Sequence, residues 1–406
     1  MQELVDSLIA GGLVPQGVPA WIPYLVAMLA FGGLVVFGFI LPIAGATTWV
    51  ERRIMARIQS RVGPNRAGPA GFLVWLCDGV KSVLKEDIIP TASDAPLFKF
   101  APFVVMVGFV GAFAAVPFGG PLIIADLNVG ILYVTSVTAL VVVGILMAGW
   151  ASNNKWSLLG GIRSAAQIVS YEIPAGLSIF PIVMLCGTLS MQGIIKEQGA
   201  APWTWNLFAN PFTFLAFPVF FISALAEGNR TPFDLPEAES ELVAGFATEY
   251  SGIRNILFFM AEWGNLYLIG AIITTLFLGG WQVPTFLDAV PVLRTILQFV
   301  TFFAKSYFWV FVAIWLRWTL PRIRVDQMMT MCWKYLVPIA FMNLLGTAVW
   351  MLAFPQGLGA VRLVLFGMTV VLLGFFFRRV AYHLRRAGLE RRHLSFNPFA
   401  TARVQW

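Results

Sequence analysis

Nine stretches of about twenty apolar residues, the length that a helix needs to cross a lipid bilayer, run through this chain of 406 residues. Hydrophobic residues make up 59% of the sequence and charged residues only 12%, so no polar surface could enclose the apolar side chains. The sequence therefore predicts an all-α protein that crosses the membrane repeatedly, and it excludes soluble, coiled-coil, disordered and disulfide-rich folds. The predicted spans are residues 22–50, 97–116, 129–150, 165–189, 211–226, 255–280, 293–320, 335–354 and 360–382.

The basic residues favour one end of these spans. Connections at that end, together with Lys99, hold 23 of the 27 Lys and Arg residues: 51–96, 151–164, 227–254, 317–334 and 378–406. Because basic loops remain in the cytoplasm, we expect the N-terminus outside and the C-terminus in the cytoplasm. Nucleic acid is not an expected partner, because the basic residues flank helices. Three parts are predicted: an N-terminal segment (1–21), an eight-span membrane domain (22–354), and a ninth helix with a basic tail (355–406).

The sequence offers no ligand set for a metal or a redox centre. The three cysteines, Cys77, Cys186 and Cys332, stand far apart, and the two histidines, His383 and His393, lie near the C-terminus. Iron–sulfur clusters and structural zinc need several thiolates or imidazoles together, and a membrane haem needs axial ligands inside the spans. We therefore expect no metal, and no cofactor bound covalently or by a ligand motif.

A segment between the first two spans, residues 72–84, has two unlike sides. Asp78 and Lys81 fall on one side, opposite an apolar side formed by Phe72, Leu73, Leu76, Val80, Val83 and Leu84. This pattern predicts an amphipathic helix lying in the membrane interface. Arginines that recur every four residues just before it are expected to share one helical face: Arg53, Arg57 and Arg61.

Acids are concentrated in the connection 227–254, which holds six of the chain's 20 acidic residues at the otherwise basic end: Glu227, Asp234, Glu237, Glu239, Glu241 and Glu249. A solvated loop is one interpretation, although Pro, Phe, Leu and Val are mixed with the acids. Asp234 is placed to cap a helix starting near Pro236, on which Glu237 and Glu241 would share a face. Crowded carboxylates in partly apolar surroundings have raised, coupled pKa values, which suits a series of proton-exchanging groups.

Further acids lie at or inside the spans. Glu51 directly follows the first span, and Glu172 and Glu262 lie inside the fourth and the sixth. An acid at such depth costs about 3 kcal/mol on insertion scales and is functional by default, the alternative being a structural hydrogen bond to a neighbouring helix. Lys305, inside the seventh span, is expected either to pair with an intramembrane acid or to extend to the interface.

At these residues the sequence resembles a known family. Stretches such as WVERRIMARIQSRVGPNRAGPAG (49–71) and LAEGNRTPFDLPEAESELVAGFATEYSGI (225–253) are similar to the NADH dehydrogenase subunit 1 family, to which the H subunit of bacterial respiratory complex I belongs. Residues 78–94, 149–172, 258–267 and 320–338 match the same family in order. The resemblance covers residues 49 to about 338, nearly three quarters of the chain.

The resemblance implies a membrane subunit of a proton-translocating NADH:quinone oxidoreductase, in the bacterial inner membrane. Such a subunit forms much of the tunnel for quinone, for example ubiquinone, and contacts hydrophilic quinone-site subunits, small membrane subunits and lipid. FMN and the iron–sulfur clusters of electron transport would lie on other subunits. Basic residues near the tunnel would be Arg52, Lys155, Arg163, Arg230, Arg322 and Arg324. The proton- or charge-coupling chain would comprise Glu51, Glu172, Glu227, Asp234, Glu237, Glu239, Glu241, Glu249 and Glu262.

Two positions depart from the family pattern. Val325 and Trp263 stand where tyrosine is usual, so any role resting on those hydroxyl groups is in doubt. Two other functions stay open at this point. A homologous subunit of a membrane-bound hydrogenase would keep the acidic loop, but the segment ERRIMARIQSRVGPNRAG favours the quinone-linked members. A free-standing ion transporter is disfavoured by the one-sided acids and the lack of a visible inverted repeat.

Overall fold

The computed structural model describes residues 22, 26, 32, 33, 36–235, 239–284, 291–355 and 357–393, and every regular element in these ranges is helical. The predicted all-α class is therefore confirmed. The predicted N-terminal segment, most of the first span, Glu237 and the end of the basic tail lie outside the described residues, as does the side chain of Glu239.

Seven helices within the described ranges are long and apolar enough to cross a membrane, and an eighth, α9 (Pro211–Glu227), is apolar but shorter. Apart from residues 22, 26, 32 and 33, the first predicted span enters this part of the chain as η1 (Val36–Ile40) and the start of α3 (Leu41–Ile58), so the count of nine stays a prediction. The long helices are α5 (Ala95–Ala112) with η3 (Phe113–Ala115), α6 (Gly130–Ala151), α7 (Lys155–Cys186), α11 (Gly252–Phe277), α12 (Pro291–Thr319), α13 (Val325–Thr330) continuing through η8 (Met331–Leu336) into α14 (Val337–Ala353), and α15 (Gly359–His393). The short elements are η2 (Pro69–Gly71), α4 (Val74–Leu84), α8 (Met191–Lys196), η4 (Pro202–Thr204), η5 (Asn206–Phe208), α10 (Glu239–Leu242) and η6 (Gly245–Ala247).

Several helix limits differ from the apolar runs. α7 begins at Lys155, ten residues before the predicted span, because the Asn154 side chain accepts a hydrogen bond from the Trp156 amide and caps the helix there. α14 is the continuation of a helix that starts at Val325, joined through a π-helical turn. Hydropathy marks where lipid ends, whereas backbone hydrogen bonding continues into water.

Of two local predictions for the connections after α3 and α9, one is wrong and one stays untested. The expected shared face of Arg53, Arg57 and Arg61 is wrong for Arg61, because α3 ends at Ile58 and Ser60 takes a left-handed φ of 56°. The short helix of the acidic connection begins, within the described residues, at Glu239. The predicted cap by Asp234 on a helix near Pro236 stays untested, because 236–238 lie outside those residues.

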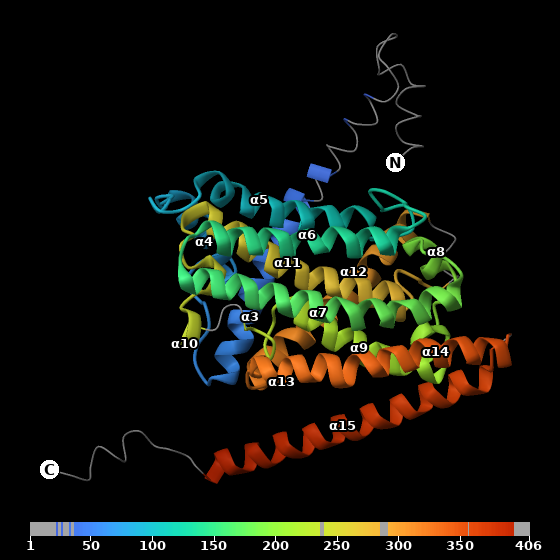
Figure 1. The fold of residues 1–406 in the computed structure, drawn as a ribbon. Helices are drawn as coiled ribbons and strands as arrows, with labels where there is room; N and C mark the ends of the chain where they lie inside the picture. Colours follow the sequence, from blue (N-terminus) through green and yellow to red (C-terminus); the bar gives the residue numbers. More distant parts are fainter. Residues whose placement is uncertain are drawn as a thin grey trace.

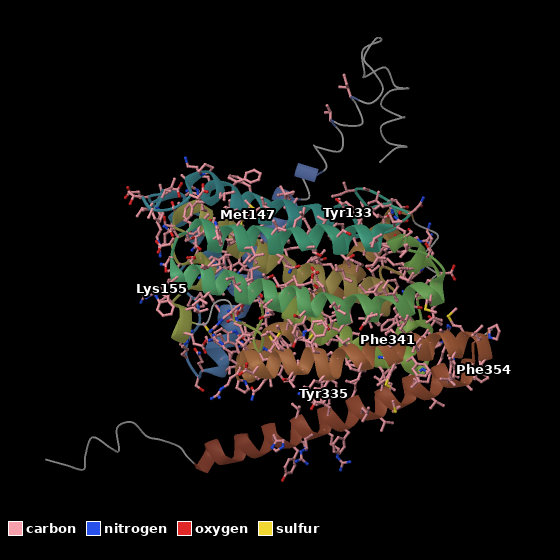
Figure 2. All side chains as sticks on the ribbon, in the orientation of Figure 1. Tyr133, Met147, Lys155, Tyr335, Phe341 and Phe354 are labelled. Carbon is pink, nitrogen blue, oxygen red and sulfur yellow. The ribbon has the colours of Figure 1, made fainter. Side chains whose placement is uncertain are left out.

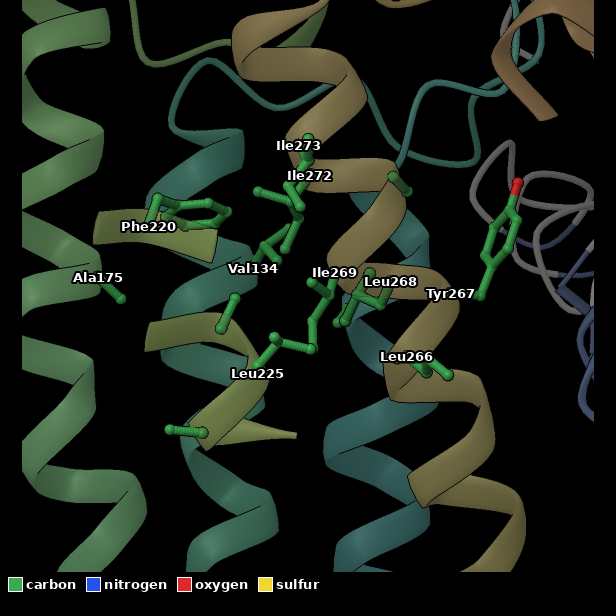
Figure 3. Close-up of a cluster of buried hydrophobic side chains, with 14 of the residues drawn as sticks. Val134, Ala175, Phe220, Leu225, Leu266, Tyr267, Leu268, Ile269, Ile272 and Ile273 are labelled. Atoms are coloured by element: carbon green, nitrogen blue, oxygen red, sulfur yellow. The ribbon is translucent and has the colours of Figure 1, made fainter. Parts of the chain in front are cut away.

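The long helices pack side by side, with α11 in the interior (Figure 1). The second half of α11, from Leu266 to Phe277, is buried throughout. Figure 3 shows its Ile269 and Ile272 directed toward Val134 of α6 and Phe220 and Leu225 of α9. This buried apolar layer fixes α11 against its neighbours.

Glycines allow α7 to approach the acidic connection closely. A Cβ atom on Gly160 would lie 2.7 Å from both the Gly245 Cα and the Phe246 amide nitrogen of η6, and neither backbone atom can move alone. On Gly176 of the same helix, a Cβ would meet nothing within 4 Å.

We therefore expect Gly160→Ala to lower the free energy of unfolding by about 1–3 kcal/mol, because the overlap pushes η6 off α7. Gly176→Ala is the control, and it should be neutral or stabilising because alanine favours a helix interior. Thermal unfolding of the purified chain in detergent measures both. Equal effects of the two substitutions would contradict a tight backbone contact at Gly160.

The polar connections meet at one end of the bundle. Lys155 marks this end in Figure 2 and Phe354 the opposite one. Asn154 Nδ2 donates to Glu249 Oε1 over 2.6 Å, and Arg254 Nη2 lies 2.8 Å from Asp87 Oδ2, so three of the predicted basic connections touch one another. We call this end the charged end.

α4 at the charged end has no buried residue. Its apolar side, which includes Leu76, Val80 and Leu84, is exposed, with Val80 59% and Leu84 80% accessible. Trp75 on the other side of α4 packs against Gly45 of α3. The amphipathic helix predicted from residues 72–84 is therefore present, with its apolar side directed away from the bundle.

Candidate functional site

The chain leaves α9 at Glu227 and turns inward, which buries Arg230. Asn229 adopts a left-handed φ of 49°, and only 2% of Arg230 is accessible. Gln167 of α7 holds the turn, because its Nε2 donates to the carbonyls of Ala226 and Phe233, each over 2.7 Å. One buried amide thus fixes the position of one buried guanidinium.

Arg230 stands between two carboxylates from different helices. Its Nη1 lies 3.2 Å from Glu262 Oε1 of α11 and 3.9 Å from Glu51 Oε2 of α3. Glu51 has a second cation, since Arg317 Nη1 of α12 lies 2.9 Å from its Oε1, and the Trp318 indole donates to the same oxygen over 3.2 Å. The two acids and two arginines balance in charge, which makes their burial tolerable. We call these four residues the charge cluster.

Trp263 covers the remaining side of the guanidinium. The Arg230 Cζ lies 4.2 Å from the centroid of the Trp263 ring, a cation–π distance. The position that lacks the usual tyrosine hydroxyl therefore presents an aromatic face to the buried cation.

Asp234 adjoins the charge cluster from the acidic connection. Its Oδ2 lies 3.6 Å from Arg322 Nη2, and the Ile323 amide donates to the Pro232 carbonyl over 3.1 Å, so this connection and the one after α12 are joined. Burial raises the pKa of Asp234 above its ordinary value, and the Glu262 carboxylate adds to the rise. Arg317, Arg322 and Arg230 oppose it.

Glu262 also lines a cavity of about 40 Å³. Glu227 and Glu262 both line it, together with Asn229, Asn255 and Asn265, whereas the other lining residues are apolar or glycine, among them Phe246 and Phe258. A water molecule needs at least about 10–15 Å³ and two to four polar partners, so the volume admits two or three waters, and the acids and asparagines are the lining residues that could bind them. Glu227 in turn lies near Thr138 of α6 and within electrostatic reach of Glu172 of α7.

The structure thus brings together Glu51, Arg230, Asp234, Glu262 and Arg322 of the predicted site, and it places Glu227 at the cavity, with Glu172 within electrostatic reach of Glu227. The other nominated residues lie outside this group. Arg163 pairs with the exposed Glu241 over 2.6 Å, Arg52 pairs with Asp78 over 2.7 Å, and Glu249 binds Asn154. Lys155 lies over the Trp156 ring, and Arg324 is exposed at the start of α13.

Arg317 and Trp318 were missed as site residues. The available signal was that Arg317 lies inside the apolar run 293–320, where a cation needs an acidic partner.

Of the two arrangements expected for Lys305, a pair with an intramembrane acid is not found among the described residues. The Lys305 Nζ donates to the carbonyls of Leu278 over 2.8 Å and Gly280 over 3.1 Å, and lies 4.7 Å from the centroid of the Trp205 ring. The ammonium therefore binds the chain that follows α11, at the end of the helix away from Glu262.

No group of three or more His, Cys, Asp or Glu side chains in the described ranges is arranged to hold a metal ion. Cys77, Cys186 and Cys332 are free thiols.

Comparison with known proteins identifies the family of this chain. The family model described as NADH dehydrogenase matches residues 31–348. The H subunit of the NADH-quinone oxidoreductase of Anaeromyxobacter dehalogenans is 56% identical over 80% of this chain and 82% of its own length. Proteins of the same name from Chlorobaculum tepidum (50% identical; 74% of this chain, 86% of the relative) and Dehalococcoides mccartyi (44%; 88% and 96%) are also similar. The resemblance in the sequence is confirmed: the chain belongs to the NADH dehydrogenase family, as a multi-pass membrane subunit of an NADH-quinone oxidoreductase.

Proposed function

We propose that this subunit forms much of a quinone tunnel and begins the route by which quinone reduction drives proton movement. The observation that carries the proposal is the placement of Glu262, which pairs with Arg230 of the charge cluster and also lines the cavity that Glu227 lines. A carboxylate in this position links a change of charge near Arg230 to a proton on the cavity side.

The proposed route runs from Asp234 and the charge cluster through Glu262 and the cavity to Glu227 and Glu172. Arg230 and Arg317 pair with the cluster acids, whereas water in the cavity would bridge Glu262 and Glu227. Electrons would come from clusters and flavin on other subunits, because this family member is expected to hold none. The remaining acids, Glu237, Glu239, Glu241 and Glu249, would extend the route along the acidic connection.

Quinone would enter from lipid beside α3 and α4, where the apolar side of α4 is exposed. Arg52, Arg322 and Arg324 are accessible at the same end and would line the approach with Lys155 and Arg163. We place the charged end in the cytoplasm, with the N-terminus outside, because it carries most of the basic residues. Hydrophilic subunits would dock there, and small membrane subunits along the lipid-facing helices.

Glu227→Gln and Glu262→Gln test the route, because each change removes a titratable group and keeps the shape. We expect the complex to assemble while quinone turnover or proton output falls by roughly tenfold or more, as for loss of a positioned acid or base. Glu197→Gln, an exposed acid at the opposite end, is the matched control and should leave both rates unchanged.

The double variant Glu227→Gln/Glu262→Gln distinguishes a proton-relay role of the two acids from a structural role. Groups acting in series are strongly non-additive, so the double variant should be little worse than the poorer single one. Assembled variants with normal turnover and normal proton output at both sites would end the relay proposal. Poor assembly with fully coupled residual activity would show instead that the acids brace the fold.

A further inference from the structure

A second hollow, separate from the small cavity beside Glu262, opens at the charged end. It has a volume of about 540 Å³, and the residues that line it include Asp94, Trp150, Asn153, Lys155 and Leu158. α5 begins beside it at Ala95 and α6 ends beside it at Ala151, each within two residues of the apolar runs 97–116 and 129–150. Because the end of an apolar run marks the edge of the hydrocarbon core, the hollow lies at the level of the lipid headgroups. We call it the interfacial groove.

Two hydrogen bonds hold the walls of the interfacial groove together. The Asp94 amide donates to the Ala151 carbonyl over 3.0 Å, and Asn153 Nδ2 donates to the Ala92 carbonyl over 2.9 Å. Asn153 has a left-handed φ of 47°, which asparagine adopts more readily than most residues. The groove is therefore shaped by backbone that is bonded across it.

Opposite charges line the interfacial groove without pairing. The exposed Asp94 carboxylate neither caps α5 nor forms an ion pair within the described residues. Lys155, at the edge of the bundle in Figure 2, is exposed too, and among those residues its ammonium contacts only the Trp156 ring, 5.1 Å from the centroid. A ligand that carries a negative and a positive group in one molecule matches two opposite charges held apart in this way.

An apolar strip leads from the interfacial groove into the membrane. Trp150 is 69% exposed, and Leu146 and Val143 precede it by four and seven residues, so the three share one face of α6. Leu146 and Val143 are also exposed. A tryptophan at the end of a spanning helix is typical of the membrane interface. The strip matches an acyl chain, which a small soluble zwitterion lacks, so the matching ligand is a phospholipid.

The two charges also select the headgroup. An ammonium such as that of Lys155 binds phosphate, and a carboxylate accepts hydrogen bonds from a primary ammonium. Ethanolamine supplies that ammonium, whereas glycerol offers Asp94 no cation. The trimethylammonium of choline has no N–H and is bound by cages of several aromatic rings. Among the described lining residues, Trp150 is the one aromatic side chain.

We infer that the interfacial groove binds phosphatidylethanolamine, with the phosphate at Lys155 and the ammonium at Asp94. The acyl chains would lie along the strip below Trp150. This site does not rest on the quinone route proposed above, because its evidence is the groove, its unpaired charges and the strip.

A dye beside the groove tests the inference on the full chain in detergent. We would label a cysteine introduced by Leu159→Cys, an exposed position next to Leu158, in a chain that carries Cys77→Ser. Phospholipids with brominated acyl chains quench such a dye when they bind beside it. Phosphatidylethanolamine should quench at the lowest concentration, ahead of phosphatidylcholine and phosphatidylglycerol.

Two substitutions should have crossed effects on the three lipids. Asp94→Asn should weaken phosphatidylethanolamine by roughly fivefold, the upper range for an accessible charged pair, and should not weaken phosphatidylglycerol. Lys155→Gln should weaken both, because both carry the phosphate. Glu86→Gln and Lys81→Gln remove exposed charges at the same end but outside the groove, and they should leave all three affinities unchanged.

The assembled complex gives a second measurement. A photoreactive amino acid at position 159 should crosslink to lipid there, and a crosslink to a protein subunit would instead assign the groove to a protein interface. Equal affinities for phosphatidylethanolamine and phosphatidylcholine would overturn the recognition of the ammonium. Equal losses of phosphatidylethanolamine and phosphatidylglycerol on Asp94→Asn would show a general disturbance of the groove and would equally overturn the inference.

Discussion

Replacing Arg230 with glutamine should destabilise the chain by about 3–5 kcal/mol, the cost of leaving buried carboxylates without a cation. Glu51 and Glu262 approach Arg230 within 3.9 Å and 3.2 Å, and without it they would repel each other in a buried site. Thermal unfolding of the purified chain and the yield of assembled complex both report the loss.

The rescue is the sharper part of this test. Arg230→Gln combined with Glu262→Gln should recover much of the stability, because Glu51 still pairs with Arg317. Arg52→Gln is the control, since it breaks the exposed pair with Asp78 and should cost at most about 1 kcal/mol. If Arg230→Gln were as mild as Arg52→Gln, Arg230 would not be what holds the charge cluster together.

Trp263→Ala should cost about 3 kcal/mol, because it removes both a large ring and the face that Arg230 lies against. Trp263→Phe keeps a smaller aromatic face and should cost about 1 kcal/mol. Trp263→Tyr should match Trp263→Phe if the ring face, and not a hydroxyl group, holds the guanidinium. Unfolding of the chain and the pH profile of quinone turnover measure the series.

The two readouts separate packing from positioning. A displaced guanidinium changes the charge balance around Glu262, so Trp263→Ala should also move the pH profile, whereas a loss of packing alone would not. Trp263→Ala equal to Trp263→Phe in both measurements would show that Arg230 does not depend on the ring.

The order and approximate positions of the long apolar helices could be anticipated because lipid imposes a long apolar run on any crossing helix. Helix ends could not, since capping by Asn154 and the π-helical turn at 331–336 depend on backbone hydrogen bonds that hydropathy does not register. The sequence therefore located these helices and misplaced some of their starts.

The acids of the site were also visible in the sequence, because a carboxylate inside an apolar run is costly. Their partners were not visible. Glu51 binds Arg317 and Trp318, some 270 positions along the chain, and only the packing of α3 against α12 brings them together. At position 263 the sequence showed that the usual tyrosine hydroxyl is absent. It did not show that the tryptophan ring lies against Arg230.

Lys305 has a mechanical consequence for the same helix. By binding the carbonyls of Leu278 and Gly280, it ties the chain that follows α11 to the middle of α12, and the half of α11 from Leu266 onward is buried all round. At its other end α11 is held by the pair between Arg254 and Asp87. We therefore expect a change of charge around Glu262 to be taken up by the side chains beside the cavity and not by sliding of the helix.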